Sequence, residues 1–545
     1  MSDVLIIGSG AGGGAAAYAL TRAGLTVTIL EAGPHYDYLA DYRMDRQDWE
    51  QPFPDKDPPH ASYAVAPLQP LDADLADLRS WNHISGLWNP SEQRISMGYH
   101  HVRGVGGSTL HFTGEAHRLH PEAFQLFSRT GIGADWPIDY AELEPYYLEA
   151  ETVIGVAGRA ESSRWRSAPY PLPDHRLSHA SSILRRGFEK AGLACEPNAL
   201  AILSAPYDDR PPCNGCNGCL RGCPLGDKGS VDVTFLRHAL ATGRCTIRSN
   251  CDVLTLEAGP DDTVTGVVAS ENGQLVRAGA PIIILAAGAV HSPRLLLNSA
   301  NAHAPDGLAN ESGEVGRNFM ETISWTSSAL HPESLGSHRG QPVDMISWSL
   351  NAPDAVEGIP GGFRFSPAQA ESDLVGPINY ATRVVPGWGR QHKQAMRATF
   401  GHVLSVAGLC ESVPHEQSKV TLSTALDRHG LPKPLIHSFL DSEAIARIAF
   451  MARTCRSILA YAGAGAVFEQ LSSYDMFSST HVFGTCRMGD DPQTSVVDRL
   501  GRAHRWRNLY IADASIFPSS GGGESPSLTI QALALRTAAG IATNR

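Results

Sequence analysis

The stretch "VLIIGSGAGGGAAAYALTRAGLTVTILE", residues 4–31, decides the fold class of this chain. It opens with four apolar residues typical of a buried strand, and then breaks into a turn in which Gly8, Gly10 and Gly13 have the spacing G-x-G-x-x-G. An Ala-rich helical stretch and a second apolar strand follow, and Glu31 comes directly after that strand. This order of strand, glycine turn, helix, strand and acid predicts a Rossmann-type dinucleotide-binding unit.

Each part of the motif has a physical reason. Gly8 permits the tight turn, Gly10 lets the backbone approach a pyrophosphate, and Gly13 allows close packing of helix on strand. The N-terminus of the helix faces the negative charge of the phosphates. Glu31 is placed to accept hydrogen bonds from a ribose hydroxyl. The motif alone does not separate NAD from FAD.

Length and composition narrow the class of protein. A chain of 545 residues is too long for one simple core, so two domains, sequential or intertwined, are expected. With 42% hydrophobic and 18% charged residues, the composition is that of a globular protein that can bury a large core. The net charge of -12 offers no attraction for phosphate backbones, which argues against a nucleic-acid partner.

The sequence gives no sign of a membrane span. Its longest apolar run, "APIIILAAGAV" at 280–290, is shorter than the roughly 18 to 20 residues of a spanning helix and is better interpreted as a buried strand with its following turn. The N-terminus shows no basic region followed by an apolar leader. We therefore expect a protein that stays in the cytoplasm or reaches the periplasm with a signal-bearing partner.

Further segments carry a family resemblance. They are "VRGVGGSTLHFTGEAHR" (102–118), "DWPIDYAELEPYYLEAE" (135–151), "ILAAGAVHSPRLLLNSA" (284–300), "VGRNFMET" (315–322), "HVFGTCRMGDDPQTSVVDRLGR" (481–502) and "NLYIADASIFPSSGGGESPSLTIQALALR" (508–536). Together, and in this order, they resemble the glucose-methanol-choline (GMC) family of flavin oxidoreductases.

The resemblance implies an α/β fold in which a Rossmann-type FAD-binding domain is interleaved with an α+β substrate domain built on an antiparallel sheet. The expected FAD-binding segments are 1–150, 235–325 and 495–545. The expected substrate domain is 326–494, and 205–230 is a separate cysteine-rich loop.

The resemblance also assigns contacts to FAD. The turn "GVGGST" (104–109) would bring its backbone close to the flat flavin ring, with two hydroxyls at the ring edge. Asp513 lies where the family contacts the ribityl chain or pyrophosphate, and Val253 where relatives place backbone against the adenine. The contacts expected in these later segments are Arg103, Gly107, Ser108, Thr109, Val253 and Asp513.

In this family a histidine in the segment H-x-x-G-T-x-x-M-G takes the proton from the substrate hydroxyl while the substrate carbon passes hydride to the flavin. Here that residue is His481. A neutral imidazole suits this step because its ordinary pKa lies near working pH and it can accept a proton in the transition state.

The second active-site position, usually Asn or His in the family, departs from the pattern. The sequence reads "GGGESPSLT" at 521–529, and counting back from the following helix places Ser525 there, whereas counting forward from the preceding Phe-Pro pair places Glu524 there. We favour Ser525, because the next residue then matches the family's proline. A serine leaves proton transfer to the histidine alone, whereas a glutamate would raise the histidine pKa and could act as a second base.

Four of the ten cysteines lie in "PPCNGCNGCLRGCPLGDKG", residues 211–229. Their spacing, C-x2-C-x2-C-x3-C-P, is that of bacterial ferredoxins and predicts an iron–sulfur cluster. Zinc is an alternative, although structural zinc usually takes two short cysteine pairs separated by a dozen or more residues. Disulfides are a second alternative, which requires export and unfavourably small rings. The four expected ligands are Cys213, Cys216, Cys219 and Cys223.

The cysteine loop further resembles the catalytic subunits of bacterial FAD-dependent sugar and polyol dehydrogenases. These hold a 3Fe-4S cluster, and Cys216 sits where their spacing differs, so 3Fe-4S is favoured and 4Fe-4S is the alternative. A cluster that passes single electrons favours a dehydrogenase with an external acceptor. The resemblance implies two partners, a c-type cytochrome and a small chaperone-like subunit.

The leading hypothesis is therefore an FAD and iron–sulfur dehydrogenase that oxidises a hydroxyl of a sugar, glycoside or polyol to a carbonyl. One alternative is an FAD alcohol oxidase that uses O2, with zinc or a vestigial cluster in the loop. Another is a flavin-binding electron-transfer subunit without catalysis. The sequence does not indicate the substrate or the carbon that is oxidised.

Overall fold

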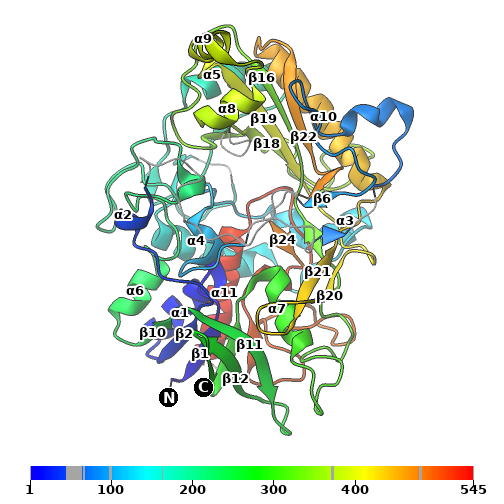
Figure 1. The fold of residues 1–545 in the computed structure, drawn as a ribbon. Coiled ribbons are helices and arrows are strands. Elements are labelled where there is room, and N and C mark those ends of the chain that lie inside the picture. The colour runs from blue at the N-terminus through cyan, green and yellow to red at the C-terminus, as the bar shows by residue number, and fades with distance from the viewer. Residues whose placement is uncertain are drawn as a thin grey trace.

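The computed structural model describes residues 2–43, 64–65, 68–96, 101–161, 164–369, 374–477 and 481–543. Figure 1 shows two layers of structure, a lower one that contains both ends of the chain and an upper one built on a separate sheet. The helices and strands that matter for the site are given below with their bounds.

The lower layer is built on a five-stranded parallel sheet with the order β10-β2-β1-β14-β25. Its strands are β1 (Val4–Ile7), β2 (Val27–Leu30), β10 (Cys245–Arg248), β14 (Ile282–Leu285) and β25 (Leu509–Ile511). All four side chains of β1 are buried, as expected for the central strand of a sheet that is covered on both faces. Chain segments from residue 4 to residue 511 thus meet in one sheet.

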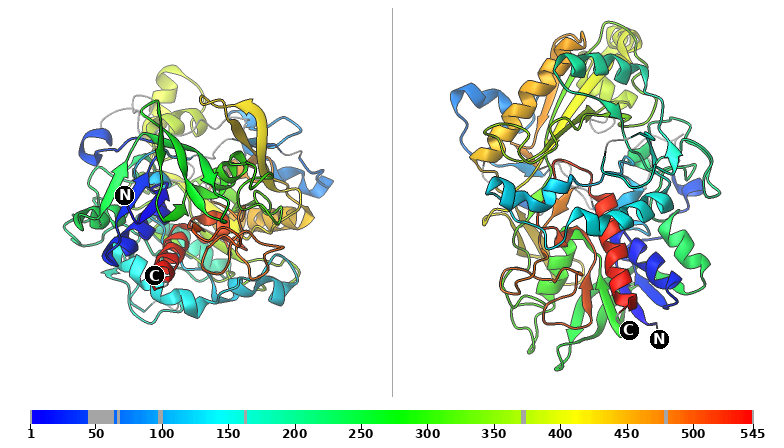
Figure 2. Two further views of the ribbon diagram at one scale, coloured as in Figure 1. Left: turned by 90° about the horizontal axis from the view of Figure 1, so that it is seen from below. Right: turned by 180° about the vertical axis from the view of Figure 1, so that it is seen from behind.

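Helix α1 (Ala11–Arg22) follows β1 directly and packs against α11 (Ser527–Thr543) and α6 (Phe235–Ala241). Figure 2 shows α11 running alongside the N-terminal segment of the chain. A Cβ atom at Gly13 would lie 2.0 Å from the Gly8 carbonyl oxygen, so only glycine allows α1 to leave the strand at this angle. The last helix therefore closes the unit that the first motif begins.

An antiparallel meander of β11 (Cys251–Ala258), β12 (Val264–Glu271) and β13 (Gln274–Ala278) follows β10 along the chain. Helix α7 (Gly288–Asn298) begins shortly after β14 and packs against β11. The apolar run interpreted as a strand and its turn is thus the strand β14 followed by the start of a helix.

The upper layer is a six-stranded sheet with the order β18-β19-β16-β22-β4-β5, in which all neighbouring strands are antiparallel. Its strands are β4 (Trp81–Asn82), β5 (Gly86–Leu87), β16 (Ile323–Leu330), β18 (Phe363–Pro367), β19 (Val403–Cys410) and β22 (Val467–Ser472). Helix α10 (Ser442–Tyr461) covers one face (Figure 1), and its first turn is capped by the side chain of Asp441.

Strand β16 shows how this sheet is divided between core and cavity. Ile323 and Trp325 are fully buried in the hydrophobic core under α10, whereas the alternating Ser324 and Thr326 are only partly buried. Because successive side chains of a strand point to opposite faces, the hydroxyl-bearing face of β16 turns away from the core.

Other elements connect or flank these layers. They are α2 (Tyr38–Asp41), α3 (Leu126–Thr130), α4 (Tyr140–Ile154), α5 (His179–Lys190), α8 (Pro377–Arg383), α9 (Gly389–Thr399), β3 (Ala64–Val65), β6 (Ile95–Ser96), β7 (Ala157–Gly158), β8 (Leu172–Pro173), β9 (Glu196–Pro197), β15 (Met320–Glu321), β17 (Met345–Ile346), β20 (Lys419–Leu426), β21 (Pro432–His437), β23 (Met476–Phe477), β24 (Val482–Phe483), and the short turns of helix η2 (Ala73–Leu78), η3 (Gly107–Leu110), η4 (Pro121–Gln125), η5 (Cys219–Arg221) and η6 (Ala514–Ile516).

The expected fold class is confirmed: a Rossmann-type parallel sheet and a separate antiparallel sheet are built from interleaved segments. The residue boundaries of the two domains remain a prediction. Among the helices in the described ranges, none is both long enough and apolar enough to cross a membrane.

Candidate active site

A cavity of about 920 Å³ opens between the parallel sheet and the hydroxyl-bearing face of β16. Most of the residues predicted from the sequence to contact a cofactor or substrate line this one space. They are Gly8, Gly10, Glu31, Arg103, Gly107, Ser108, Thr109, Val253 and Asp513 on the cofactor side, and His481 and Ser525 on the substrate side. The tertiary structure thus brings together residues that span more than five hundred positions.

The glycine turn after β1 forms one wall of the cavity. A Cβ atom at Gly10 would meet no atom closer than the Gly107 Cα at 3.9 Å, so the backbone here faces open space that a ligand can enter. Gly8 has φ +96°, in the region that favours glycine. Gly13 does not line the cavity, since it packs against Gly8 as described above.

Glu31 ties the two glycine turns together. Its Oε2 accepts from the Ser9 amide at 3.0 Å and the Ser9 hydroxyl at 2.7 Å, and its Oε1 accepts from the amides of Gly33 at 3.0 Å and Gly104 at 3.1 Å. Burial raises the pKa of this carboxyl even though these bonds oppose the shift. Both oxygens are thus engaged by the protein, and the expected contact with a ribose remains a prediction.

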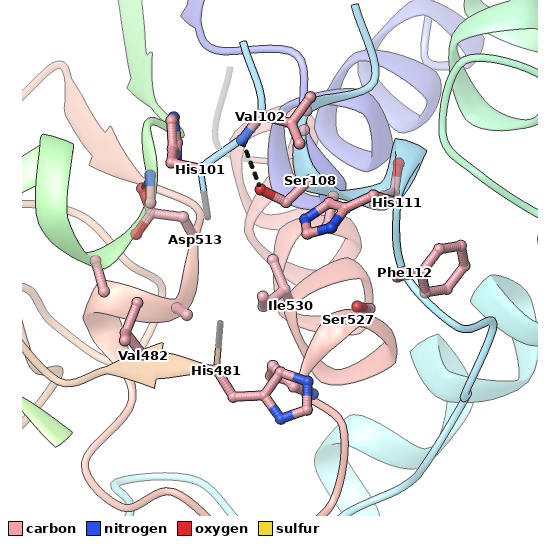
Figure 3. A pocket seen from close by; sticks show the side chains of 18 of the residues that line it. His101, Val102, Ser108, His111, Phe112, His481, Val482, Asp513, Ser527 and Ile530 are labelled. Carbon is pink, nitrogen blue, oxygen red and sulfur yellow. Dashed lines mark hydrogen bonds between the residues drawn. The ribbon is translucent and has the colours of Figure 1, made fainter. Parts of the chain in front are cut away.

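The second glycine turn positions Ser108 and Thr109 differently. The Ser108 hydroxyl faces the cavity and accepts from the Val102 amide at 3.4 Å (Figure 3). The Thr109 hydroxyl donates to the Gly106 carbonyl at 2.6 Å and accepts from the Val231 amide at 3.0 Å. Thr109 therefore braces the turn, and Ser108 is the hydroxyl that a bound ring can reach.

Asp513 begins the turn after β25 and holds it against α7. Its Oδ2 accepts from the Gly288 amide at 2.9 Å and from the Ser292 hydroxyl at 2.5 Å, and its Oδ1 accepts from the Ser515 amide at 2.9 Å. One cavity is lined by two glycine turns, the N-terminus of α1 and the Asp513 carboxylate, and this lining fits the FAD that the sequence implies.

His481 lies across the pocket from Ser108 and Val102 (Figure 3). Burial, reinforced by the Arg364 guanidinium, lowers the pKa of His481 to about 4, and the Glu115 carboxylate opposes this shift. The imidazole is therefore neutral at neutral pH, which is the form that can accept a proton.

The structure separates the two candidates for the second active-site position. Ser525 lines the cavity, and its hydroxyl donates to Glu115 Oε2 at 3.1 Å. Glu524 does not line it; its carboxylate is buried on the other side of the loop, where Oε1 accepts from the His120 amide at 3.1 Å and lies 3.5 Å from Arg164. Ser525 and His481 thus share the cavity, and Glu524 does not.

Sequence reasoning missed Glu115 and Arg364. Arg364, on β18, donates to Glu115 Oε1 at 2.7 Å and to Oε2 at 3.0 Å, and both side chains are buried. Burial alone would raise the pKa of Glu115, but the charges of Arg364 and other neighbours lower it to about 2. The two residues are 249 positions apart, and no local spacing pattern marks either of them.

The substrate side of the cavity also carries a row of hydroxyls. Thr322, directly before β16, and Ser324 and Thr326 on that strand line the cavity at alternate positions, and Leu409 and Leu471 from the neighbouring strands lie beside them. Hydroxyls at a two-residue period on a flat sheet can bind several polar groups of one substrate.

The four clustered cysteines line a second, much smaller cavity. Cys219 and Cys223 are buried and Cys216 is exposed, and all ten cysteines of the chain are free thiols in the structure. Burial raises the pKa of Cys213 to about 12 and that of Cys223 to about 11, so these thiols are protonated at neutral pH. The Cys223 thiol donates to Asp227 Oδ1 at 3.0 Å.

These cysteines do not form a ready-made metal site. Within the described ranges, no three His, Cys, Asp or Glu side chains come close enough together to hold a metal ion. The loop nevertheless borders the large cavity, because Leu220 and Arg221, which lie between Cys219 and Cys223, line it.

Family models match most of the chain. A model described as GMC oxidoreductase matches residues 96–323, and a second model with the same description matches residues 414–534. A model of an NAD(P)-binding Rossmann-like domain matches residues 6–36.

Several characterised proteins are similar to this chain over nearly its whole length. A 6'''-hydroxyparomomycin C oxidase of Streptomyces lividus is 30% identical, covering 99% of this chain and 91% of the relative. The fructose dehydrogenase large subunit of Gluconobacter japonicus is 28% identical, covering 98% and 97%. A 2-methyl-1,2-propanediol dehydrogenase of Mycolicibacterium austroafricanum is 28% identical, covering 98% and 94%.

Solved structures share the fold at low sequence identity. A pyridoxine 4-oxidase from Mesorbium loti is 17% identical with a TM-score of 0.62, covering 99% of both chains. A formate oxidase variant from Aspergillus oryzae is 16% identical with a TM-score of 0.68, covering 100% of this chain and 98% of that one.

Proposed function

Because the chain belongs to the GMC oxidoreductase family, as its sequence motifs led us to expect, we propose that it oxidises a hydroxyl group of a sugar, glycoside or polyol to a carbonyl. The chain is an FAD-dependent oxidoreductase that acts on CH–OH groups. The meeting of His481 and Ser525 in one cavity, beside the dinucleotide-binding turns, carries the proposal. The relatives are named for their action on 6'''-hydroxyparomomycin C, fructose and 2-methyl-1,2-propanediol, and these names support this substrate class.

His481 is the proposed general base. Its imidazole is neutral above a pKa of about 4, so it can take the proton of the substrate hydroxyl throughout the neutral range. FAD, when bound, supplies the acceptor for the hydride that leaves the substrate carbon.

The residues that would hold FAD come from both glycine turns and from the end of β25. Gly8 and Gly10 leave room for the pyrophosphate at the N-terminus of α1, and Ser108 offers a hydroxyl to the ring. Arg103, 3.6 Å from Asp252, lies at the edge of the same cavity as a positive charge for the phosphates.

The substrate class is tested by anaerobic titration of the FAD-loaded protein with sugars, glycosides and diols. Loss of the oxidised flavin absorbance on addition of at least one of them is the expected result. If no compound of the panel reduces the fully occupied flavin, the protein is a flavin-binding electron-transfer subunit and the proposed activity is wrong.

We further propose that Cys213, Cys216, Cys219 and Cys223 hold an iron–sulfur cluster, 3Fe-4S rather than 4Fe-4S, and that electrons leave to a c-type cytochrome with a small chaperone-like subunit in the complex. The ferredoxin-like spacing, the small cavity that the four cysteines line and the position of their loop beside the larger cavity support this proposal. One relative is named as the large subunit of a dehydrogenase.

Iron and acid-labile sulfide in anaerobically purified protein, with EPR before and after reduction, test the cluster. A signal in the oxidised protein that disappears on reduction is expected for 3Fe-4S. Absence of iron from a protein that is full of flavin would exclude the relay.

An FAD oxidase that uses O2 is the second candidate. Two relatives, including the paromamine 6'-oxidase of Streptomyces fradiae at 29% identity, are named oxidases, and the four thiols form no preassembled metal site within the described residues. Hydrogen peroxide released in air in equal amount to the substrate consumed would favour this candidate over the dehydrogenase.

A further inference from the structure

A buried hydrogen-bond network holds Ser525 in the wall of the cavity, which Glu115 lines as well. The Ser525 amide donates to His117 Nδ1 at 3.1 Å, and the Ser525 hydroxyl donates to Glu115 Oε2 at 3.1 Å. Asn198 Nδ2 donates to Glu115 Oε1 at 3.1 Å, and Arg364 clamps both carboxylate oxygens. All five side chains are at least 96% buried, so little water competes for these bonds.

The directions of these bonds are fixed. Because His117 Nδ1 accepts from an amide, its proton is on Nε2, which donates to Asn198 Oδ1 at 2.9 Å. Asn198 must therefore present its NH2 group to Glu115 and to the Val343 carbonyl, which accepts at 3.0 Å. Only one assignment of donors and acceptors satisfies these hydrogen bonds, and in it Glu115 accepts from every neighbour.

The Arg364 guanidinium keeps Glu115 ionised, which is the form that only accepts hydrogen bonds. Its two Nη atoms face the two carboxylate oxygens, and its Nε donates to the Gly523 carbonyl at 2.7 Å, two residues before Ser525. An ionised carboxylate has no proton to donate. The loop that carries Ser525 and the carboxylate behind it are therefore held by one guanidinium.

A serine hydroxyl has one proton and two acceptor lone pairs. In this network the proton of Ser525 is committed to Glu115, so its oxygen faces the cavity as an acceptor. The oxygen of the reacting hydroxyl would need a donor, which Ser525 is not. A different group of the substrate, one that itself donates, must meet it.

We propose that the Ser525–Glu115 pair is an acceptor site for a second hydroxyl of the substrate, carried on the carbon next to the one that is oxidised. His481 and Ser525 line the same cavity, and the Ser525 hydroxyl is oriented there by its 3.1 Å bond to Glu115 Oε2, so one substrate can meet both side chains with neighbouring groups. The enzyme is therefore selective for vicinal diols, the arrangement found in sugars and polyols. This inference rests on the proposed function and narrows its substrate class.

The second hydroxyl takes no part in the transfer of protons or electrons. The reacting hydroxyl gives its proton to His481, and its carbon loses a hydride, with two electrons, to the flavin. The second hydroxyl donates a hydrogen bond to Ser525 and is recovered unchanged. Glu115 also lines the cavity, and its role in this proposal is to fix the direction of the Ser525 hydroxyl as a positioning residue.

The test uses the FAD-loaded full chain, an artificial electron acceptor and matched probes. The probes are 1,2-propanediol against 1-propanol, and methyl β-D-glucopyranoside against its four monodeoxy derivatives. In the wild type, loss of the neighbouring hydroxyl should lower kcat/KM by about 10-fold to 100-fold, since it leaves a buried polar site without its partner. Loss of the reacting hydroxyl itself should abolish turnover.

Ser525→Ala should reduce that discrimination to less than about 3-fold, because the acceptor is gone. Ser525→Thr keeps the hydroxyl and should retain the discrimination between the probes. Glu115→Gln should also weaken it, since a glutamine NH2 can donate to Ser525 and turn the hydroxyl proton toward the cavity. Flavin absorbance of each variant reports folding, and if Glu115→Gln does not fold, the discrimination measured for Ser525→Ala alone decides the outcome.

Two failures are distinguishable. If the wild type oxidises probes with and without the neighbouring hydroxyl equally well, or if Ser525→Ala keeps the full discrimination, the inference is wrong and the proposed function stands. If no probe and no sugar reduces the bound flavin, the proposed function is wrong and the inference falls with it.

Discussion

The two walls of the large cavity are built in opposite ways. The cofactor wall takes its decisive features from one short segment, in which the glycines act through backbone geometry and the Glu31 carboxylate accepts hydrogen bonds mostly from backbone amides. The substrate wall takes single side chains from distant strands and loops, such as Glu115 and the loop before α11. A motif that works through backbone geometry is local, whereas a hydrogen-bond network needs only proximity in space.

The largest expected effect distinguishes two glycines of the turn after β1, of which only Gly10 lines the cavity. Gly13→Ala would place a Cβ atom 2.0 Å from the Gly8 carbonyl oxygen, and because that oxygen belongs to the backbone the overlap is not easily relieved. We expect little folded, flavin-loaded protein. Gly10→Ala, whose Cβ would have its nearest neighbour at 3.9 Å, should fold with a normal melting temperature as apoprotein and bind FAD more weakly. Equal behaviour of the two variants would contradict the distinction.

On the substrate wall, His481→Ala should lower kcat by about 100-fold to 10,000-fold through loss of the general base. Flavin content and the melting temperature should change little, because the imidazole faces the cavity. Stopped-flow reduction of the flavin measures the chemical step directly. Reduction at the wild-type rate would remove His481 from its assigned role.

Arg364→Met tests how far the substrate wall depends on charge pairing. It leaves the Glu115 carboxylate buried without its counter-charge, which typically costs about 3–5 kcal/mol of folding free energy. The double variant with Glu115→Gln should recover much of this loss, since no unpaired charge remains. Urea unfolding of the two single variants and the double variant forms the cycle, and additive losses would refute the coupling.

The pH dependence of the same wall follows from the His481 pKa of about 4. The base must be neutral to accept a proton, so kcat/KM should fall as pH decreases through about 4, rather than through the ordinary histidine pKa near 6.5. The acid limb of the pH profile of kcat/KM, measured with a substrate that does not titrate, gives the pKa of this base. A limb centred near pH 6.5 would show that the imidazole is solvated.

The smallest effect concerns Glu411, buried beneath the loop that carries Ser525. Burial, reinforced by the Glu524 carboxylate, raises its pKa to about 7, and its Oε1 accepts from the Ser520 amide at 3.0 Å. A raised folded-state pKa contributes stability below about pH 4.5 that is lost as pH rises through 7. Glu411→Gln should be more stable than the wild type by about 1–2 kcal/mol at pH 8 and equal to it near pH 5. Urea unfolding at both pH values measures this, and an equal difference at both would rule out titration as the cause.

In the cysteine loop, unlike in the cofactor wall, a distinctive sequence spacing does not by itself produce a formed binding site. Its C-x2-C-x2-C-x3-C-P pattern is as distinctive as the glycine motif, yet among the described residues the four cysteines line a small cavity without forming a group that could hold a metal ion. Glycines act through a backbone that the chain itself folds, whereas thiolates are arranged by the metal that they bind.

The sequence by itself determined the Rossmann unit and the family, because each is written in consecutive residues whose backbone or segment context is local. The catalytic role of His481 was predicted from the same kind of segment and stays a prediction. The choice of Ser525 over Glu524 as the cavity residue was decided only in the tertiary structure, since a one-residue shift in a loop reverses which side chain faces in. The same holds for Glu115 and Arg364. Their pairing across 249 residues depends on where the antiparallel sheet meets the cofactor domain, and no local physical rule encodes that distance.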